Sequence, residues 1–170
     1  MDPQDWIGNW RLDTTHTELA FHSPTFWGFA HVKGIFTDVE GSAEAVADGN
    51  VTGRLSISAA SVNTGIGRRD KHLRSADFFD VERFPLIEVS VESAEVTGTS
   101  WVTLSILVTV KGQEQEYDLP VHVRDAAGGE VQLQTTTTLN RQAFGVVGNL
   151  LGMMGDAVTI EAAAVFVKQS

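Results

Sequence analysis

Apolar and polar side chains alternate along most of this sequence, and this period of two constrains the fold more than any other feature. In the segment 51–59, Val51, Leu55 and Ile57 share one phase and Arg54 lies in the other. Successive side chains of a strand point to opposite faces, so this pattern predicts a strand with one buried face. Similar alternation recurs in the segments 17–22, 27–36, 87–91, 102–110, 117–123, 131–139 and 158–166.

Short turn signals separate many of these segments. They are Glu40-Gly41-Ser42, Asp48-Gly49-Asn50, Thr97-Gly98-Thr99, Lys111-Gly112-Gln113 and Ala127-Gly128-Gly129. Short links between about eight strands favour an antiparallel meander. An open meander of this size would leave unpaired edges, so we expect an all-β fold in which an up-and-down antiparallel barrel closes on itself.

Small residues lie in the phase expected to face the barrel interior. They include Gly53, Ala59, Ala162 and Ala164. A barrel of about eight strands is either filled by its own side chains or holds one small ligand, and small inner residues favour a cavity. No linker or repeat divides the chain, so we expect a single domain over residues 1–170.

Charge and composition exclude several classes of partner. The formal net charge of -10 disfavours nucleic acid and anionic lipid surfaces, and no apolar run approaches the roughly 20 residues of a spanning helix. We therefore expect no nucleic-acid partner and no membrane insertion. The chain has no cysteine, which excludes disulfides and thiolate chemistry. Its first residues, MDPQDWIGNW, lack a signal-peptide pattern, which predicts a cytoplasmic location.

Two segments interrupt the alternation. The first, 65–85, is too long for a hairpin turn and concentrates basic residues before Phe78 and Phe79. We expect a short helical lid over a barrel end, with helical turns around 70–78. The second, 140–156, mixes glycines with Phe144 and methionines, which is typical of an adaptable apolar cover.

Three stretches resemble the YceI-like family, over about residues 10–168. They read WRLDTTHTELAFHSPTFWGFAHVKGIFTDVEG (10–41), SVNTGIGRRDKHLRSADFFDVERFPLIEVS (61–90) and TTTLNRQAFGV (136–146). The resemblance implies an extended, lipocalin-like barrel with a helical element at one end. Some members of the family hold a polyisoprenoid chain, which implies that this protein binds a long apolar molecule.

Aromatic and other large apolar side chains are the candidates for contact with such a chain. They are Trp27, Phe29, Phe36, Leu73, Phe78, Phe79, Phe144, Met153, Met154 and Phe166. Ordinary core packing is an equally good interpretation of the aromatic ones, because the core and the pocket of a ligand-holding barrel are the same surface.

Basic residues at the barrel mouth are candidates for an anionic head group such as a diphosphate. They are Arg68, Arg69, His72, Arg74 and Arg141. In the alternative interpretation, Arg69 and Asp70 pair with neighbours such as Asp77, Asp80 or Glu82 and fasten the lid. We expect Lys71 and Arg74 to be solvated.

The sequence predicts no metal site, no cofactor and no catalytic residue. His16, His22, His31, His72 and His122 show no metal-ligand spacing, and neither a G-x-S-x-G elbow nor a P-loop is present. We expect Asp13 and His16 to form a hydrogen-bonded pair that fixes the start of the following strand.

The predicted function is therefore the binding, storage or transport of a long-chain apolar ligand, such as a polyisoprenoid, a polyprenyl phosphate or a quinone. One alternative is an enzyme that acts on an isoprenoid or another lipid, with His16, His72 or Arg141 as acid-base or anion-binding groups. A second alternative is a packed structural or interaction barrel. Association into a homodimer is left open.

Overall fold

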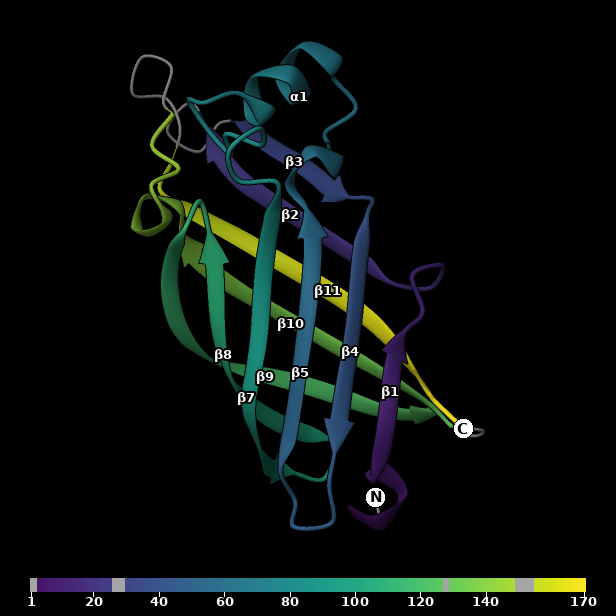
Figure 1. The fold of residues 1–170 in the computed structure, drawn as a ribbon. Helices are drawn as coiled ribbons and strands as arrows, with labels where there is room; N and C mark the ends of the chain where they lie inside the picture. The colour runs from purple at the N-terminus through teal and green to yellow at the C-terminus, as the bar shows by residue number, and fades with distance from the viewer. Residues whose placement is uncertain (1–2, 26–29, 127–128, 149–154) are drawn as a thin grey trace.

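The structure, a computed structural model, describes residues 3–25, 30–126, 129–148 and 155–170, and most of them belong to β-strands (Figure 1). The strands are β1 (Gly8–Leu12), β2 (Glu18–Thr25), β3 (Ala30–Phe36), β4 (Val39–Ala45), β5 (Val51–Ser58), β6 (Val62–Asn63), β7 (Leu86–Gly98), β8 (Trp101–Val110), β9 (Gln113–Ala126), β10 (Glu130–Asn140) and β11 (Ala157–Lys168). The helical elements are α1 (Gly67–Arg74) and the 3-10 turns η1 (Pro3–Trp6), η3 (Ala59–Ser61) and η4 (Arg141–Phe144).

Eight antiparallel strands form a closed ring. Their order is β1-β4-β5-β7-β8-β9-β10-β11, and β11 pairs back onto β1 through Leu12 and Phe166. The remaining strands β2, β3 and β6 continue from β11, because its other half pairs with β2. The expected closed barrel is confirmed, and every segment with alternating side chains contains a strand.

Three strands, β1, β4 and β6, lie outside the alternating segments. Strand β4 does alternate, but its buried phase contains the small residues Gly41, Ala43 and Ala45 besides Val39. Side chains this small give a weak hydrophobic period, which is why the sequence pattern did not mark the strand.

The barrel interior is most tightly packed at its two ends. Trp10, Leu12 and Phe166 are buried at one end, and Leu73 and Phe78 are buried below α1 at the other. Along the middle of the wall, large apolar residues that pack against the core are only half-buried, and these are Leu55, Val91, Leu104, Leu119, Leu133 and Ile160. A fully packed interior would bury them as completely as the residues at the ends. The middle of the barrel is therefore less tightly filled.

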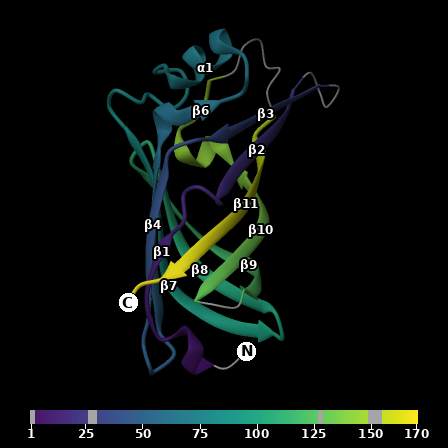
Figure 2. The same cartoon turned by 90° about the vertical axis from the view of Figure 1, so that its right-hand side faces the viewer.

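Helix α1 covers the end of the barrel away from the two termini (Figure 2). It spans 67–74 rather than 70–78, with Asp70 in its first turn and Arg74 in its last, as the helix dipole favours. The loop after it is fixed by backbone bonds, in which the Phe79 N–H donates to Leu73 O and the Val81 N–H to Arg74 O. None of the helices among the described residues has the length and apolarity needed to span a membrane.

Candidate functional site

Aromatic side chains gather beneath α1. The ring of Phe36, from β3, lies 5.6 Å from the ring of Phe21 and 5.8 Å from that of Phe79. Phe78 and Leu73 are buried beside them, and Phe36 and Phe79 are half-buried. The structure therefore brings four of the predicted ligand-contact residues together, namely Phe36, Leu73, Phe78 and Phe79.

The other predicted contact residues are dispersed. Phe144 is buried in η4, with its ring 6.4 Å from that of Tyr117 on β9. Phe166 is buried at the far end of the barrel, where it lies opposite Leu12 and Val131. Trp27, Phe29, Met153 and Met154 lie outside the described residues.

Two arginines of α1 bind the backbone of the preceding segment. Arg69 donates from Nε to Thr64 Oγ1 at 2.8 Å and from Nη2 to Thr64 O at 3.0 Å. Arg74 donates to Ala60 O at 2.7 Å and to Val62 O at 2.8 Å. The expectation that Arg74 is solvated is wrong, because the last turn of α1 lies over these carbonyls. Arg68 is exposed.

Asp70 completes this fastening. Its carboxylate accepts hydrogen bonds from the Thr64 N–H and hydroxyl. The hydroxyl bond, above all, lowers the pKa of Asp70 below its ordinary value, with the backbone bond and the nearby Arg74 and Arg69 acting in the same direction. Fastening of the lid by Arg69 and Asp70 is therefore confirmed, although their shared partner is Thr64.

The expected acidic partners are engaged elsewhere. Asp77 pairs with His72 at 3.0 Å, and Asp80 pairs with Arg83 at 3.4 Å. The Asp70 carboxylate stabilises the fold at pH values above its unfolded pKa, and this contribution is lost as the pH falls through the lowered folded pKa.

Arg141 organises the segment that follows β10. Its guanidinium is buried and donates to Val146 O at 2.7 Å, Gly148 O at 2.9 Å and Gly155 O at 2.9 Å. It also lies 3.5 Å from the Asp156 carboxylate. This side chain was expected to serve a head group, but the structure places it among backbone acceptors within the protein.

The predicted pair of Asp13 and His16 is confirmed. His16 Nδ1 lies 2.8 Å from Asp13 Oδ2 in the connection between β1 and β2, with the imidazole exposed. This hydrogen bond is the main reason why the pKa of His16 is raised above its ordinary value. Any stabilisation from the pair is present below the unfolded pKa of His16 and is lost as the pH rises through the folded pKa.

Asp13→Asn should lower the pKa of His16, because an amide cannot supply the charge that stabilises the imidazolium. An NMR titration of the five histidines measures this directly. The imidazole of His31, which is in β3, serves as the internal control, and we expect its titration to be unchanged. An unaltered His16 titration in the variant would contradict the assigned hydrogen bond.

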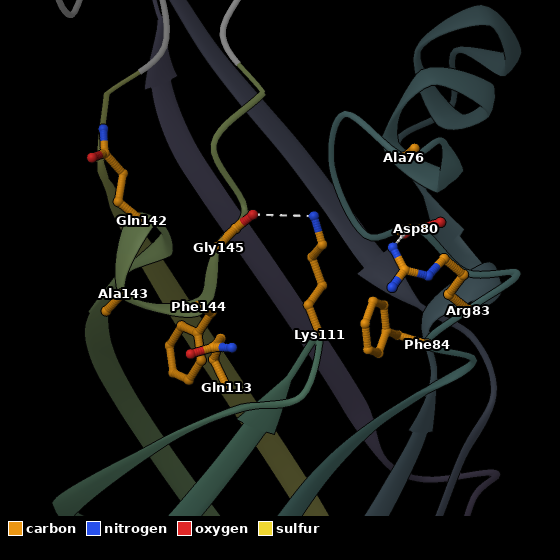
Figure 3. Close-up of a pocket in the computed structure, with 10 residues that line it drawn as sticks. All are labelled: Ala76, Asp80, Arg83, Phe84, Lys111, Gln113, Gln142, Ala143, Phe144 and Gly145. Atoms are coloured by element: carbon orange, nitrogen blue, oxygen red, sulfur yellow. Dashed lines mark hydrogen bonds and ion pairs between the residues drawn. The ribbon is translucent and has the colours of Figure 1, made fainter.

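A cavity of about 480 Å³ opens between η4, the turn that joins β8 to β9, and the loop before β7 (Figure 3). Across it, Lys111 Nζ donates to Gly145 O at 3.1 Å, while the Arg83 guanidinium lies over the Phe84 ring. The alternation of the sequence marked Lys111 only as a turn residue. A possible signal was the Lys-Gly pair, because both residues have positive φ and such hairpin turns more often carry Asn or Asp at the first position.

No group of three or more His, Asp or Glu side chains that could hold a metal ion occurs in the described part of the chain. A second depression, of about 370 Å³, is lined by residues of β10 and β11 together with His16. The apolar interior and the cavity beside η4 are therefore the features with the geometry of a ligand site.

Comparison with known proteins agrees with this architecture. The model of the YceI-like domain matches residues 10–166. The chain belongs to the YceI-like domain family. A UPF0312 protein of Staphylococcus aureus is 28% identical over 174 residues, which cover 93% of this chain and 96% of the relative. A UPF0312 protein of Pseudomonas putida is 28% identical over 128 residues, covering 71% of this chain and 67% of the relative.

Solved structures share the fold of this YceI-like domain at low sequence identity. BcnA of Burkholderia cenocepacia superposes with a TM-score of 0.82 at 18% identity, covering 91% of this chain and 98% of its own. A polyisoprenoid binding domain from Saccharophagus degradans superposes with a TM-score of 0.78 at 16% identity, covering 94% and 98%.

Proposed function

We propose that this YceI-like domain binds one long-chain apolar molecule inside its barrel and stores or carries it. The observation that carries the proposal is the row of large, half-buried apolar side chains along the middle of the inner wall. The polyisoprenoid binding domain of Saccharophagus degradans has the same fold, which supports an isoprenoid, a polyprenyl phosphate or a quinone as the ligand.

In this proposal the ligand is held by burial. Apolar surface removed from water contributes about 25 cal/mol per Å², so a chain that buries several hundred Å² gains on the order of 10 kcal/mol before entropy costs. Phe36 and Phe79 are the proposed contacts near α1, because both are half-buried and belong to the aromatic cluster. Leu73, Phe78 and Phe144 would close the same end, and Phe166 the other.

The surroundings of the candidate catalytic groups support binding rather than catalysis. His16 lies exposed on a connection and pairs with Asp13. His72 is exposed and pairs with Asp77, while Arg141 is bound to backbone carbonyls. No two of these three candidates are paired with each other, as an acid-base site would require.

Titration of lipid-free protein with geranylgeraniol tests the proposal. We expect saturable quenching of tryptophan fluorescence with a dissociation constant below about 1 μM, and recovery of the alcohol unchanged after incubation. A chemically altered product would favour the enzyme alternative. No saturable binding of geranylgeraniol or of a quinone would contradict the proposal.

The contribution of a head group is a separate prediction. If the exposed Arg68 meets a diphosphate, Arg68→Glu should weaken binding of geranylgeranyl diphosphate by about 1–2 kcal/mol and leave a quinone unaffected. Binding of the diphosphate should also weaken with salt, which screens exposed charges over about 10 Å at 0.1 M.

Arg74→Glu is the contrasting variant, because Arg74 binds Ala60 O and Val62 O. It should lower thermal stability and weaken both ligands equally. An Arg68 variant with unchanged diphosphate affinity and unchanged salt dependence would exclude a head-group role for this residue.

A further inference from the structure

The barrel wall divides between β9 and β10. Their paired register runs from Ala126 opposite Glu130 to His122 opposite Gln134, where it ends. Beyond that point, 113–121 of β9 keep their register with β8, and 135–140 of β10 keep theirs with β11. Among the described residues, no ladder joins these two halves. We call this gap in the pairing the seam.

Pro120 explains why the ladder stops. The Thr135 hydroxyl donates to Pro120 O at 2.8 Å, so the polar backbone edge of Pro120 faces β10. In an antiparallel strand, the N–H and C=O of one residue point to the same side. Continuing the register beyond His122 would place Pro120 opposite Thr136 at a position that requires an N–H, and proline has none.

The seam combines apolar side chains with unpaired backbone. Tyr117, Leu119 and Leu139 flank it, are half-buried and pack against the core. By the same alternation, the backbone groups of Glu116 and Asp118 face β10 and have no ladder partner in the described part of the chain. Buried backbone groups need hydrogen-bond partners, so the seam is open to water or to a ligand.

Helical turn η4 closes the wide end of the seam. It follows β10 directly and places the ring of Phe144 against Tyr117 of β9. One hydrogen bond from Lys111 to Gly145 O spans from the start of β9 to this turn, beside the cavity of about 480 Å³ (Figure 3).

The α1 end of the barrel is fastened more strongly. Arg74 makes two charge-assisted bonds to backbone carbonyls, and Arg69 and Asp70 both bind Thr64. The Leu73 side chain below them is buried. Displacing α1 would break all of these contacts, whereas displacing Phe144 from the seam needs fewer to be broken.

We propose that the seam is a lateral port, through which an apolar chain slides sideways into the barrel when η4 moves Phe144 away from Tyr117. The port rests on the proposed function, since it serves a ligand held in the interior. Its substrate class is an unbranched or isoprenoid chain, which can pass lengthwise between two strands.

Two substitutions test the port in opposite directions. Pro120→Val restores the N–H that faces Thr136, so it should extend the ladder and slow ligand release by about tenfold or more. Phe144→Leu shortens the plug and should speed release by about tenfold. The probe is anthraniloyl-labelled geranylgeraniol, and its release is followed by stopped-flow fluorescence. Pro85→Val, which replaces a proline outside the seam, should leave release unchanged.

Amide hydrogen exchange supplies a second readout. The amides of Glu116, Asp118, Thr136 and Thr138 should exchange fast in the ligand-free wild type and become protected in Pro120→Val. Release rates that stay unchanged although these amides are protected would overturn the port, as would an unchanged rate in Phe144→Leu. Failure of the wild type to bind the probe would instead contradict the proposed function.

Discussion

Arg141→Met is expected to lower the free energy of unfolding by about 3–5 kcal/mol, the scale for breaking a buried charged network. Methionine keeps most of the apolar volume but removes every donor, which leaves the carbonyls of Val146, Gly148 and Gly155 without this partner. The effect is large because the guanidinium is buried and joins η4 to the start of β11. Urea unfolding followed by far-UV circular dichroism measures it.

The matched control is Arg83→Met, because Arg83 makes a single ion pair, at 3.4 Å, with a side chain that is 74% exposed. Exposed pairs of this kind contribute about 0–1 kcal/mol, so the control should unfold almost as the wild type does. Equal losses in the two variants would contradict the central role assigned to Arg141.

Ala164→Phe is expected to reduce the affinity for geranylgeraniol by about 100-fold or more while leaving the fold intact. Ala164 packs against the core on the inner phase of β11, so a phenyl ring there would occupy the space proposed for the chain. In a roomy interior the ring is accommodated, and the melting temperature should change little. Titration and thermal unfolding of the same sample measure both effects.

The neighbouring position supplies the control. Ala163 lies on the opposite phase of β11, beside the outer depression, so Ala163→Phe should leave the affinity unchanged. If the barrel were fully packed instead, Ala164→Phe would overpack the core and cost about 1–3 kcal/mol of stability. Retained binding in a folded Ala164→Phe protein would place the ligand elsewhere.

The alternation of apolar and polar residues was sufficient to predict the closed barrel, because strand faces and a buried interior follow from a period of two. The partners of the arginines were not predictable in the same way. Arg74 reaches Ala60 O and Val62 O, 14 and 12 residues earlier, and backbone acceptors leave no mark in the sequence. Nearby carboxylates offered a visible alternative that the fold does not use.

Pro120 illustrates a signal that the sequence did contain. It interrupts the alternating segment 117–123, and a proline within such a run indicates a strand that lacks a partner on one side. Which side is unpaired depends on the direction of the Pro120 carbonyl, and that direction became clear only from its bond with Thr135.

Mass spectrometry of an organic extract from freshly purified protein tests the central claim most directly. The account predicts an isoprenoid, quinone or similar long apolar chain in near-stoichiometric amount, which is absent from identically purified Ala164→Phe protein and retained by Ala163→Phe. Wild-type protein that yields no such molecule, and that also fails to take up added geranylgeraniol, would contradict the claim that the barrel holds an apolar ligand.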